Sequence, residues 1–278
     1  MLEAQSKLLH LYPETLHEAL ELFKKYPDMV LMGGGQTLLP QWRETTYPKK
    51  VLCLNKIKSL RGIEQQGKRL FIGSGVTLAE LAGSALVQQL VPTLAKLALT
   101  MGDCFMRNRG TVVGALCTTT YGNCISTAFL GLNALIHTTE RDFFVHEYVQ
   151  EGPYKIRLNI GEIIKGLSFS TPFITSYQSI RLIPARSALI TIYGSKIKNQ
   201  QFIGIGGKGH RVFRATELET QLKWHNLAQI NDSILQKFIE NQQLLGNNEQ
   251  EQEYIRAQTK RLLLCLIADF SAPFASDA

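Results

Sequence analysis

The stretch Val30-Leu31-Met32-Gly33-Gly34-Gly35-Gln36-Thr37-Leu38-Leu39-Pro40 decides the fold of this chain. The apolar run of residues 29–32 predicts a short buried strand, which three consecutive glycines end. Glycine loses more backbone entropy on folding than any other residue, so this triplet indicates positive φ angles or a very close approach. Successive backbone N–H groups in such a turn bind anions such as phosphate, although a plain tight turn explains the same residues equally well.

A second glycine-containing loop lies within residues 101–116. Gly110 and Gly114 allow close backbone approach, and Arg107 and Arg109 bring positive charge to the same segment. For either arginine alone, a solvated surface position is the better interpretation. Two such loops together would suit a diphosphate held from both sides.

Composition limits the class of protein. The chain has 278 residues, enough for two or three domains, and 45% of them are apolar, which is typical of a soluble globular protein. Its formal charge of +7 is dispersed, with no basic run and no nucleic-acid-binding motif. We therefore expect no nucleic-acid partner and prefer an anionic small molecule or an acidic protein.

Cysteine usage and the N-terminus indicate the compartment. Five cysteines form no Cys-x-x-Cys pair, which argues against a disulfide framework or a zinc site. The first residues lack the pattern of a signal peptide, and no apolar run is long enough to span a membrane. We expect a cytoplasmic protein without a membrane span.

The residues that usually carry out chemistry are scattered. Six histidines stand apart from one another, and neither Ser126 nor Ser168 lies in a Gly-x-Ser-x-Gly motif. We therefore predict no metal site and no catalytic side chain. A bound organic cofactor would then perform the chemistry, and the protein would position it.

Local patterns predict the remaining elements. Residues 62–73 read as a hairpin, and Thr77 with Glu80 forms a capping box that starts a helix. Residues 122–136 read as an apolar helix, and residues 177–193 read as two paired strands. Residues 204–209 fit Gly-x-Gly-x-x-Gly, but no apolar helix follows them, so we interpret them as a strand-end turn.

Four segments give the chain a family resemblance. Residues 31–40 and 106–114 together resemble the FAD-binding (medium) subunit of molybdenum hydroxylases, with the carbon-monoxide dehydrogenase branch nearer than the xanthine dehydrogenase flavoprotein subunit. Residues 70–77 and 206–215 are similar to further segments of that family. The resemblance therefore spans nearly the whole chain.

The resemblance implies an α+β fold. It would be the FAD-binding fold of the vanillyl-alcohol oxidase type, with two α+β subdomains, followed by a smaller C-terminal α+β domain. On this basis residues 1–56 form FAD-binding subdomain 1, residues 57–171 form FAD-binding subdomain 2, and residues 172–278 form the C-terminal flavoprotein domain.

The resemblance also implies a set of FAD-binding residues. In the first loop, backbone N–H groups would hold the pyrophosphate and two residues before them would flank the flavin. The second loop would line the diphosphate and the adenosine end, and one arginine would lie near the cofactor. The implied residues are Leu31, Met32, Gly33, Gly34, Gly35, Gln36, Thr37, Leu38, Met101, Asn108, Gly110, Thr111, Gly114, Ala115 and Arg181.

In such enzymes the flavin accepts electrons from a molybdopterin subunit through iron–sulfur clusters and passes them to an acceptor. The resemblance therefore implies an oxidoreductase component, with a molybdopterin-binding large subunit and a 2Fe-2S subunit as partners. Substrate chemistry would take place on the large subunit.

Some residues depart from the family pattern. Val113 stands where the family usually has glycine, Ala115 replaces a polar residue, and Arg186-Ser187 replaces an acidic-aromatic pair. Residues 118–124 contain no acid to bond the ribose, so Thr120 or Asn123 would have to substitute. These departures keep a second hypothesis open, in which the chain is a structural or adaptor subunit that has lost its flavin.

Overall fold

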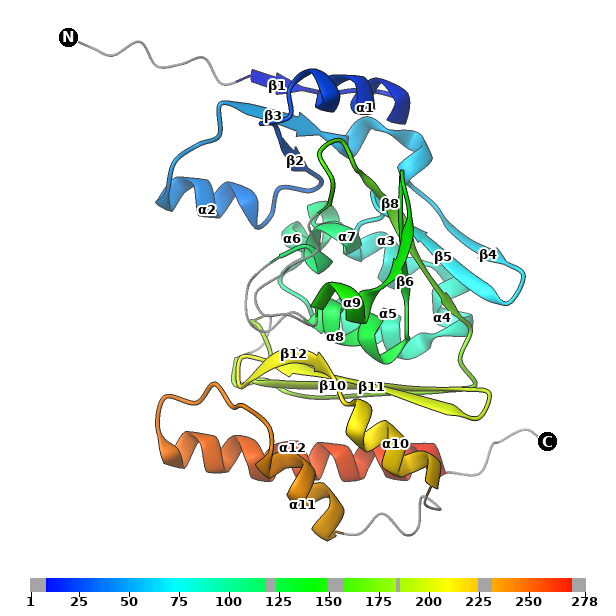
Figure 1. Cartoon of the computed structure of the whole chain (residues 1–278), viewed down its shortest axis with the longest axis vertical. Helices are drawn as coiled ribbons and strands as arrows, with labels where there is room; N and C mark the ends of the chain where they lie inside the picture. Colours follow the sequence, from blue (N-terminus) through cyan, green and yellow to red (C-terminus); the bar gives the residue numbers. More distant parts are fainter. Residues whose placement is uncertain (1–8, 119–123, 150–157, 184–185, 225–231, 272–278) are drawn as a thin grey trace.

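The structure is a computed structural model that describes residues 9–118, 124–149, 158–183, 186–224 and 232–271. Three β-sheets follow one another along the long axis of the molecule, and helices fill the space between the second and third sheets and cover the far side of the third (Figure 1).

The first sheet is parallel and contains the strand predicted before the glycine triplet. Its order is β1 (Leu9–Leu11), β3 (Lys50–Cys53), β2 (Val30–Met32), and Leu31 pairs with Leu52. The crossovers contain α1 (Leu16–Lys25) and α2 (Leu38–Glu44). Thr15 caps α1 by accepting a hydrogen bond from the Glu18 N–H.

The second sheet is antiparallel, in the order β4-β5-β8-β6-β7. The predicted hairpin of residues 62–73 is present as β4 and β5. The strands are β4 (Ile63–Gln66), β5 (Arg69–Gly73), β6 (Leu135–Thr138), β7 (Asp142–Phe144) and β8 (Ile164–Ser170).

Short helices pack against this second sheet. The predicted capping box starts the first of them: Thr77 accepts from the Glu80 N–H, and the Glu80 carboxylate accepts from the Thr77 N–H. The helices are α3 (Leu78–Gly83), α4 (Ala85–Leu90), α5 (Pro92–Leu99), α6 (Cys104–Arg109), α7 (Val112–Leu116), α8 (Cys124–Gly131) and α9 (Val145–Val149). Two 3₁₀ turns, Leu54–Lys56 and Lys58–Leu60, precede β4.

The third sheet is antiparallel, in the order β12-β11-β10-β9, and the predicted pairing of residues 177–193 appears in it as β9 and β10. Its strands are β9 (Ile174–Ile180), β10 (Ile190–Ile197), β11 (Gln200–Gly207) and β12 (His210–Arg214). One face carries α10 (Thr216–Trp224), α11 (Asp232–Glu240) and α12 (Glu249–Ser271).

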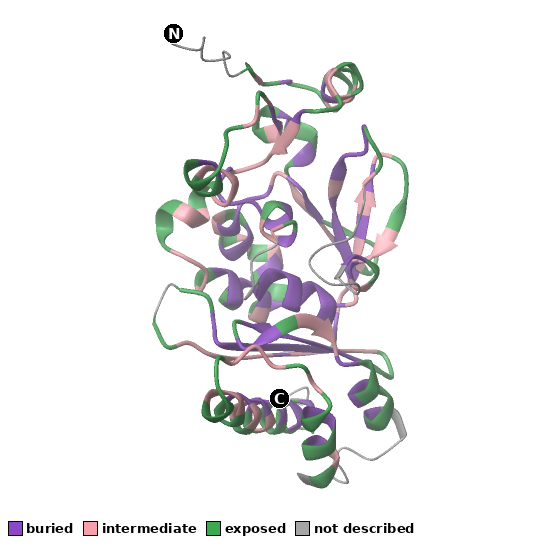
Figure 2. Ribbon diagram, turned by 60° about the vertical axis from the view of Figure 1, so that its left-hand side comes forward, coloured by how far each residue is buried: buried purple, intermediate pink, exposed green. Residues whose placement is uncertain are grey.

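The other face of the third sheet lies on α8. Every residue of α8 is buried, and this central region is drawn almost wholly as buried in Figure 2. A Cβ at Gly204 would overlap the carbonyl oxygen of Thr127, so the glycine lets helix and strand approach closely. The strand-end turn predicted at residues 204–209 is therefore wrong for Gly204 and Gly206, which lie inside β11. Both positions are glycine because α8 packs closely against the strand there.

The helix predicted for residues 122–136 is too long at its C-terminal end. In the described part, α8 ends at Gly131, and Asn133 adopts a positive φ of 47° before β6 begins at Leu135. Asparagine tolerates this left-handed conformation, so it ends the helix where apolar periodicity alone would continue it.

Candidate functional site

The first glycine loop turns sharply at the C-terminal end of β2. Gly35 has a positive φ of 72°, and its carbonyl oxygen accepts a hydrogen bond from the Leu39 N–H at 3.0 Å, which begins α2. Within the described part of the chain, no hydrogen bond uses the backbone N–H groups of residues 34–37. A row of unpaired N–H groups ahead of a helix is the arrangement that binds phosphate oxygens.

The second loop joins α6 to α7 and is fixed by the chain next to it. The Gly110 carbonyl oxygen accepts from the Leu78 N–H at 2.9 Å, and the Val112 N–H donates to the Val76 carbonyl oxygen at 2.8 Å. Thr111 caps α7 by accepting from the Gly114 N–H at 3.1 Å. These bonds hold the loop at the end of β5.

The two loops touch each other directly. A Cβ at Gly34 would overlap the carbonyl oxygen of Arg109 and lie 3.0 Å from the Gly110 Cα. A Cβ at Gly33 would lie 2.8 Å from the Thr111 Oγ1. Of the three glycines, one therefore supplies a positive φ and two allow the second loop to cross the first.

Two adjoining cavities open at this crossing. One, of about 430 Å³, extends toward Arg61 and is called here the Arg61 cavity. The other, of about 460 Å³, extends toward Ser187 and is called here the Ser187 cavity. Both are lined by Leu31, Gly33, Gly34, Thr111, Gly114 and Cys117.

Most of the FAD-binding residues implied by the resemblance line one or both cavities. In the Ser187 cavity these are Leu31, Gly33, Gly34, Gly35, Gln36, Thr37, Leu38, Met101, Gly110, Thr111, Gly114 and Ala115. Asn108 lines the Arg61 cavity. Segments far apart in the sequence thus meet at one cleft, and the role of each residue toward a cofactor stays a prediction.

Met32 and Arg181 do not line either cavity. Met32 packs in a small hydrophobic cluster with Trp42 and Val51 on the far side of β2. Arg181 lies behind the wall of the Ser187 cavity, where its Nη1 donates to the Arg186 carbonyl oxygen at 2.6 Å. Arg186 immediately precedes Ser187, so Arg181 holds part of that wall in place.

The remaining contacts of Arg181 form a polar cluster. Its Nη2 donates to the Thr100 Oγ1 at 2.9 Å, to the Tyr177 hydroxyl at 3.2 Å and to the Cys124 Sγ at 3.5 Å. Burial lowers the pKa of the guanidinium, but the contacts with Tyr177 and Cys124 outweigh burial and raise the pKa overall. Arg181 therefore stays positively charged beside the cavity.

The Arg61 cavity contains polar groups that the resemblance did not supply. Arg61 donates to the Asn55 carbonyl oxygen at 3.4 Å and lies 3.7 Å from the Glu80 carboxylate, a long and half-exposed ion pair. Ser74 is buried, and its Oγ has no hydrogen-bond partner among the described residues. A buried hydroxyl without a partner is costly, so this atom is suited to a ligand in the cavity.

Arg61 and Ser74 carry no motif in the sequence that joins them, because they come from separate segments of the chain. The only signal was Ser74 itself, which follows a strand in the segment of residues 70–77 similar to the family. Arg107, which we considered part of the charged loop, instead donates to the carbonyl oxygens of Met101 and Gly102, at 3.2 and 2.7 Å. Arg109 does line the Arg61 cavity.

The electrostatics of the cleft favour an anion. No aspartate or glutamate is among the described residues that line the two cavities, whereas Arg61 and Arg109 are. Two glycine loops in contact, unpaired N–H groups, two arginines and an unpartnered hydroxyl fit the diphosphate and the sugar and base groups of FAD.

Val113 lies in the helical turn of α7 and is not among the described residues with positive φ, so its backbone conformation does not require glycine. Its side chain packs in the main hydrophobic cluster and also lines the Arg61 cavity. Thr120 and Asn123, the expected substitutes for the ribose-binding acid, lie outside the described residues.

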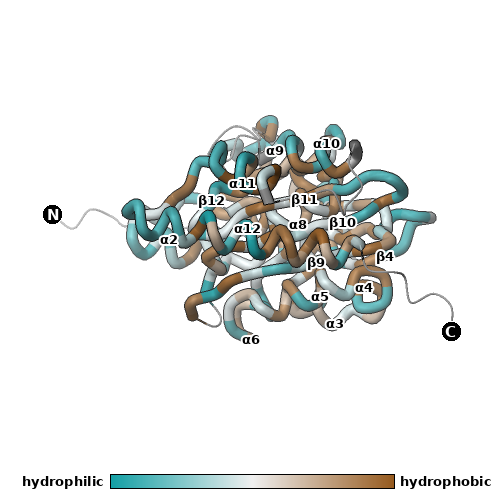
Figure 3. Tube along the Cα trace, turned by 90° about the horizontal axis from the view of Figure 1, so that it is seen from below, coloured by the Kyte–Doolittle hydropathy of each residue, from teal (hydrophilic) through white to brown (hydrophobic). Residues whose placement is uncertain are grey.

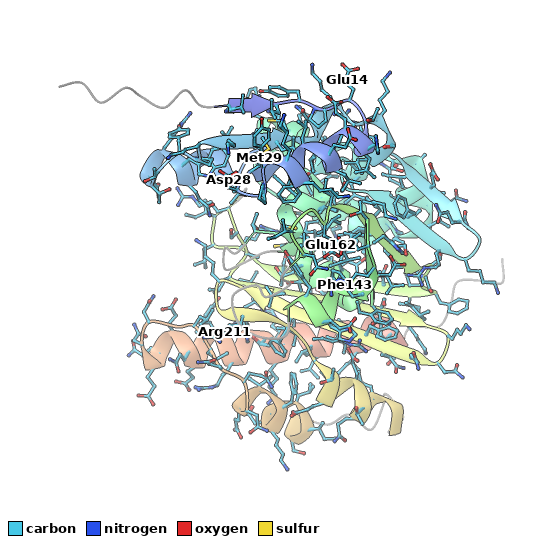
Figure 4. All side chains as sticks on the ribbon, turned by 45° about the horizontal axis from the view of Figure 1, so that its top comes forward. Glu14, Asp28, Met29, Phe143, Glu162 and Arg211 are labelled. Carbon is cyan, nitrogen blue, oxygen red and sulfur yellow. The ribbon has the colours of Figure 1, made fainter. Side chains whose placement is uncertain are left out.

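The loop before β8 forms another wall of the Arg61 cavity through Leu158 and Ile163. Glu162, which is labelled in Figure 4, fixes this loop. Its buried carboxylate accepts from the Thr138 hydroxyl at 2.6 Å, the Arg141 Nε at 3.1 Å and the Asn159 N–H at 2.8 Å. Burial raises its pKa, but these hydrogen bonds lower it by more, so the net pKa is lowered.

Over the described ranges, no three side chains of histidine, cysteine, aspartate or glutamate lie close enough together to hold a metal ion. No described helix is long and apolar enough to cross a membrane.

Fold and site together define a class: an α+β protein with a cationic, glycine-walled cleft for a dinucleotide. Residues 5–170 match the family described as the FAD binding domain in molybdopterin dehydrogenase. This match covers more than half of the chain, which therefore belongs to that family.

Individual relatives agree with the assignment. The carbon monoxide dehydrogenase medium chain of Hydrogenophaga pseudoflava is 35% identical over 104 residues, which are 37% of this chain and 36% of that relative. The glyceraldehyde dehydrogenase medium chain of Sulfolobus acidocaldarius is 24% identical over 226 residues, covering 74% and 77%.

A solved structure shares the fold over nearly the whole chain. Reconstituted CO dehydrogenase from Oligotropha carboxidovorans superposes with a TM-score of 0.82 at 19% identity, covering 97% of this chain and 98% of the other. The predicted family, the α+β class and FAD as the cofactor of the family are thereby confirmed.

Proposed function

We propose that this chain is the FAD-binding electron-transfer subunit of a molybdopterin-dependent hydroxylase or dehydrogenase. One observation carries the proposal: the two glycine loops cross in backbone contact, and a cationic cleft without acidic residues among its described lining opens on both sides. Family membership supplies the cofactor.

The first loop would hold the diphosphate through its N–H groups. Residues 33–37 present these groups at the crossing, and Thr111 faces them from the second loop. Bound there, the flavin supplies one- and two-electron redox chemistry, while the protein binds it, orients it and sets the charge around it. Met32 and Arg181 would act from behind the walls.

The enzyme assignment is that of an oxidoreductase component. The cleft contains no pair of acid and base side chains among its described residues, which supports placing the substrate chemistry on a partner. The proposed partners are a molybdopterin-binding large subunit and a 2Fe-2S subunit, because the relatives are medium chains of dehydrogenases.

Two further assignments belong to the proposal. We place the protein in the cytoplasm, since its cysteines suggest a reducing compartment. We also divide the chain into residues 1–56, 57–171 and 172–278. The three sheets support this division, because each takes its strands from one of these ranges.

The experiment is to purify the chain with its complex and measure the flavin released on denaturation. The proposal expects the absorption bands of flavin and about one FAD per chain. A colourless protein that also fails to take up added FAD would contradict it and leave the flavin-deficient adaptor subunit. Loss of the acidic-aromatic pair at Arg186-Ser187 is the feature that favours that alternative.

A further inference from the structure

Arg214, the last residue of β12, joins the third sheet to the helices around the second sheet. Its Nε donates to the Glu219 carboxylate of α10 at 2.9 Å, and its Nη1 donates to the Asn133 Oδ1 at 2.8 Å. Asn133 lies in the turn between α8 and β6, where the next carbonyl oxygen, of Ala134, accepts from the Val145 N–H of α9 at 2.8 Å. Charge-assisted hydrogen bonds are short and strong, so they fix the guanidinium beside the start of α9.

The same guanidinium faces His146 on α9. Its Nη1 lies 3.5 Å from the His146 Nδ1, and the His146 ring stacks on that of Phe144 with 5.2 Å between centroids. In the view from below, α9 and α10 lie along the same edge of the molecule (Figure 3). An arginine side chain has no acceptor atom, so a hydrogen bond between the two requires an Nδ1 without a proton. A protonated ring would instead place two like charges at this contact.

The charges around His146 favour its neutral form. Burial and the charge of Arg214 lower the pKa of His146, and together they outweigh Glu147 and Glu219, which raise it. Glu147 lies on α9 itself, β12 presents Arg214, and α10 presents Glu219. Asp142, the charged residue of β7, forms an ion pair on β6 instead, and α8 carries no charged residue. His146 therefore gains a proton only as the pH falls below its usual pKa of about 6.5.

The opposite side of α9 forms a wall of the Arg61 cavity. Tyr148 comes two residues after His146, which places it about 200° further around the helix. It lines the Arg61 cavity, and its side chain hydrogen-bonds the thiol of Cys117, which lines both cavities. One short helix thus contacts Arg214 on one side and the cleft on the other.

We propose that Arg214 is a positioning residue for the cofactor: through Asn133 and His146 it fixes α9, and α9 holds Tyr148 in the wall of the Arg61 cavity. The inference rests on the proposed function. Neither Arg214 nor Glu219 lines a cavity, so both act on the site only through α9. A ligand binds more weakly when its wall is in place only part of the time, by the fraction of protein that is competent to bind.

The test is titration of the cofactor-free full-length chain with FAD at about pH 7.5 and about pH 5.5, followed by flavin fluorescence. In the wild type we expect the Kd to rise about 3- to 10-fold between the two, because a single proton changes an equilibrium at most tenfold per pH unit below a pKa of about 6.5. His146→Asn keeps an acceptor near the position of Nδ1 but cannot be protonated. The ratio of the two Kd values should fall to about 1 in this variant.

Asn133→Gly tests the other contact of Arg214. Glycine accepts the positive φ of 47° at this position, so the variant removes the Oδ1 acceptor without straining the turn. It should raise the Kd for FAD about 3- to 10-fold at neutral pH, because a hydrogen bond to a charged group is lost. His17→Asn is the matched control: the His17 side chain is 84% exposed on α1, so this variant should keep the wild-type Kd and ratio.

The outcomes separate the two proposals. A wild-type ratio of about 1, a wild-type ratio in His146→Asn or a wild-type Kd in Asn133→Gly would overturn the positioning role of Arg214 and leave the proposed function intact. Wild-type protein that binds no FAD at either pH would overturn both.

Discussion

Gly34→Ala tests the crossing of the two loops with the smallest possible side chain. The added methyl group would overlap the carbonyl oxygen of Arg109 and lie 3.0 Å from the Gly110 Cα. Both are backbone atoms, and the second loop is held by hydrogen bonds to Leu78 and Val76. The loops therefore need to separate, because no flexible side chain is present to move aside.

The cost follows from overpacking. Forcing one extra methyl group into a closely packed contact typically costs about 1–3 kcal/mol. If the loops separate in the free protein, the N–H groups of residues 34–37 lose their position opposite Thr111. We then expect FAD to bind roughly 10- to 100-fold more weakly, since each 1.4 kcal/mol is a factor of ten.

The assay is titration of the cofactor-free protein with FAD, followed by the change in flavin fluorescence, with urea unfolding of each variant. Gly83→Ala is the control, because a Cβ at Gly83 meets nothing within 4 Å and this residue lies at the end of α3. It should bind FAD normally and unfold at the same or slightly higher urea concentration. Gly34→Ala with wild-type affinity and stability would refute the loop contact.

Four other predictions address single residues. Ser74→Ala should raise the Kd for FAD about 3- to 10-fold, because it removes a hydroxyl that lines the Arg61 cavity. The urea midpoint of unfolding should not change, because the Ser74 Oγ has no hydrogen-bond partner among the described residues. A large loss of stability would instead show a structural role. Val113→Gly should destabilise the protein by about 1–3 kcal/mol, because it removes a buried side chain from a helical turn, and it should not tighten FAD binding. Tighter binding in the FAD titration would mean that the valine impairs the site. Burial lowers the pKa of His210 to about 4, so the unfolded chain binds a proton at this residue more readily than the folded chain does. The free energy of unfolding should therefore fall by up to about 3 kcal/mol as pH decreases from about 6.5 to 4. His210→Gln should flatten that pH dependence in urea unfolding. The pKa of Glu162 is lowered in the folded protein, so the carboxylate stabilises the fold above about pH 4.3 and this stabilisation is lost as pH falls through the folded-state pKa. Glu162→Gln should lower the free energy of unfolding by about 1–3 kcal/mol at neutral pH. Equal stability of the variant and the wild type at that pH would contradict the role of this carboxylate.

The parts of the fold that depend on local signals could be predicted. The capping box of Thr77 and Glu80 is complete within four residues, and the hairpin turn at Gly67 uses a positive φ of 60°. The two glycine loops stood out because glycine is expensive unless the backbone requires it. Their meeting at one cleft was foreseen from the family resemblance.

The parts that depend on distant contacts could not be predicted. The reason that residue 34 is glycine lies at Arg109, and the reason that residue 204 is glycine lies in α8. Ser74 becomes a candidate only when its surroundings show that its hydroxyl has no partner. Arg181 was expected near the cofactor, and only the structure shows that its side chain bonds Arg186 and Thr100.

A crystal structure of this chain with FAD bound would test directly whether the two crossing loops hold the cofactor. The account predicts the diphosphate at the crossing of residues 33–37 with Thr111, and the remainder of the cofactor extending into both the Arg61 and the Ser187 cavities. FAD bound elsewhere, or crystals without cofactor grown at saturating FAD with side chains filling the cleft, would contradict it.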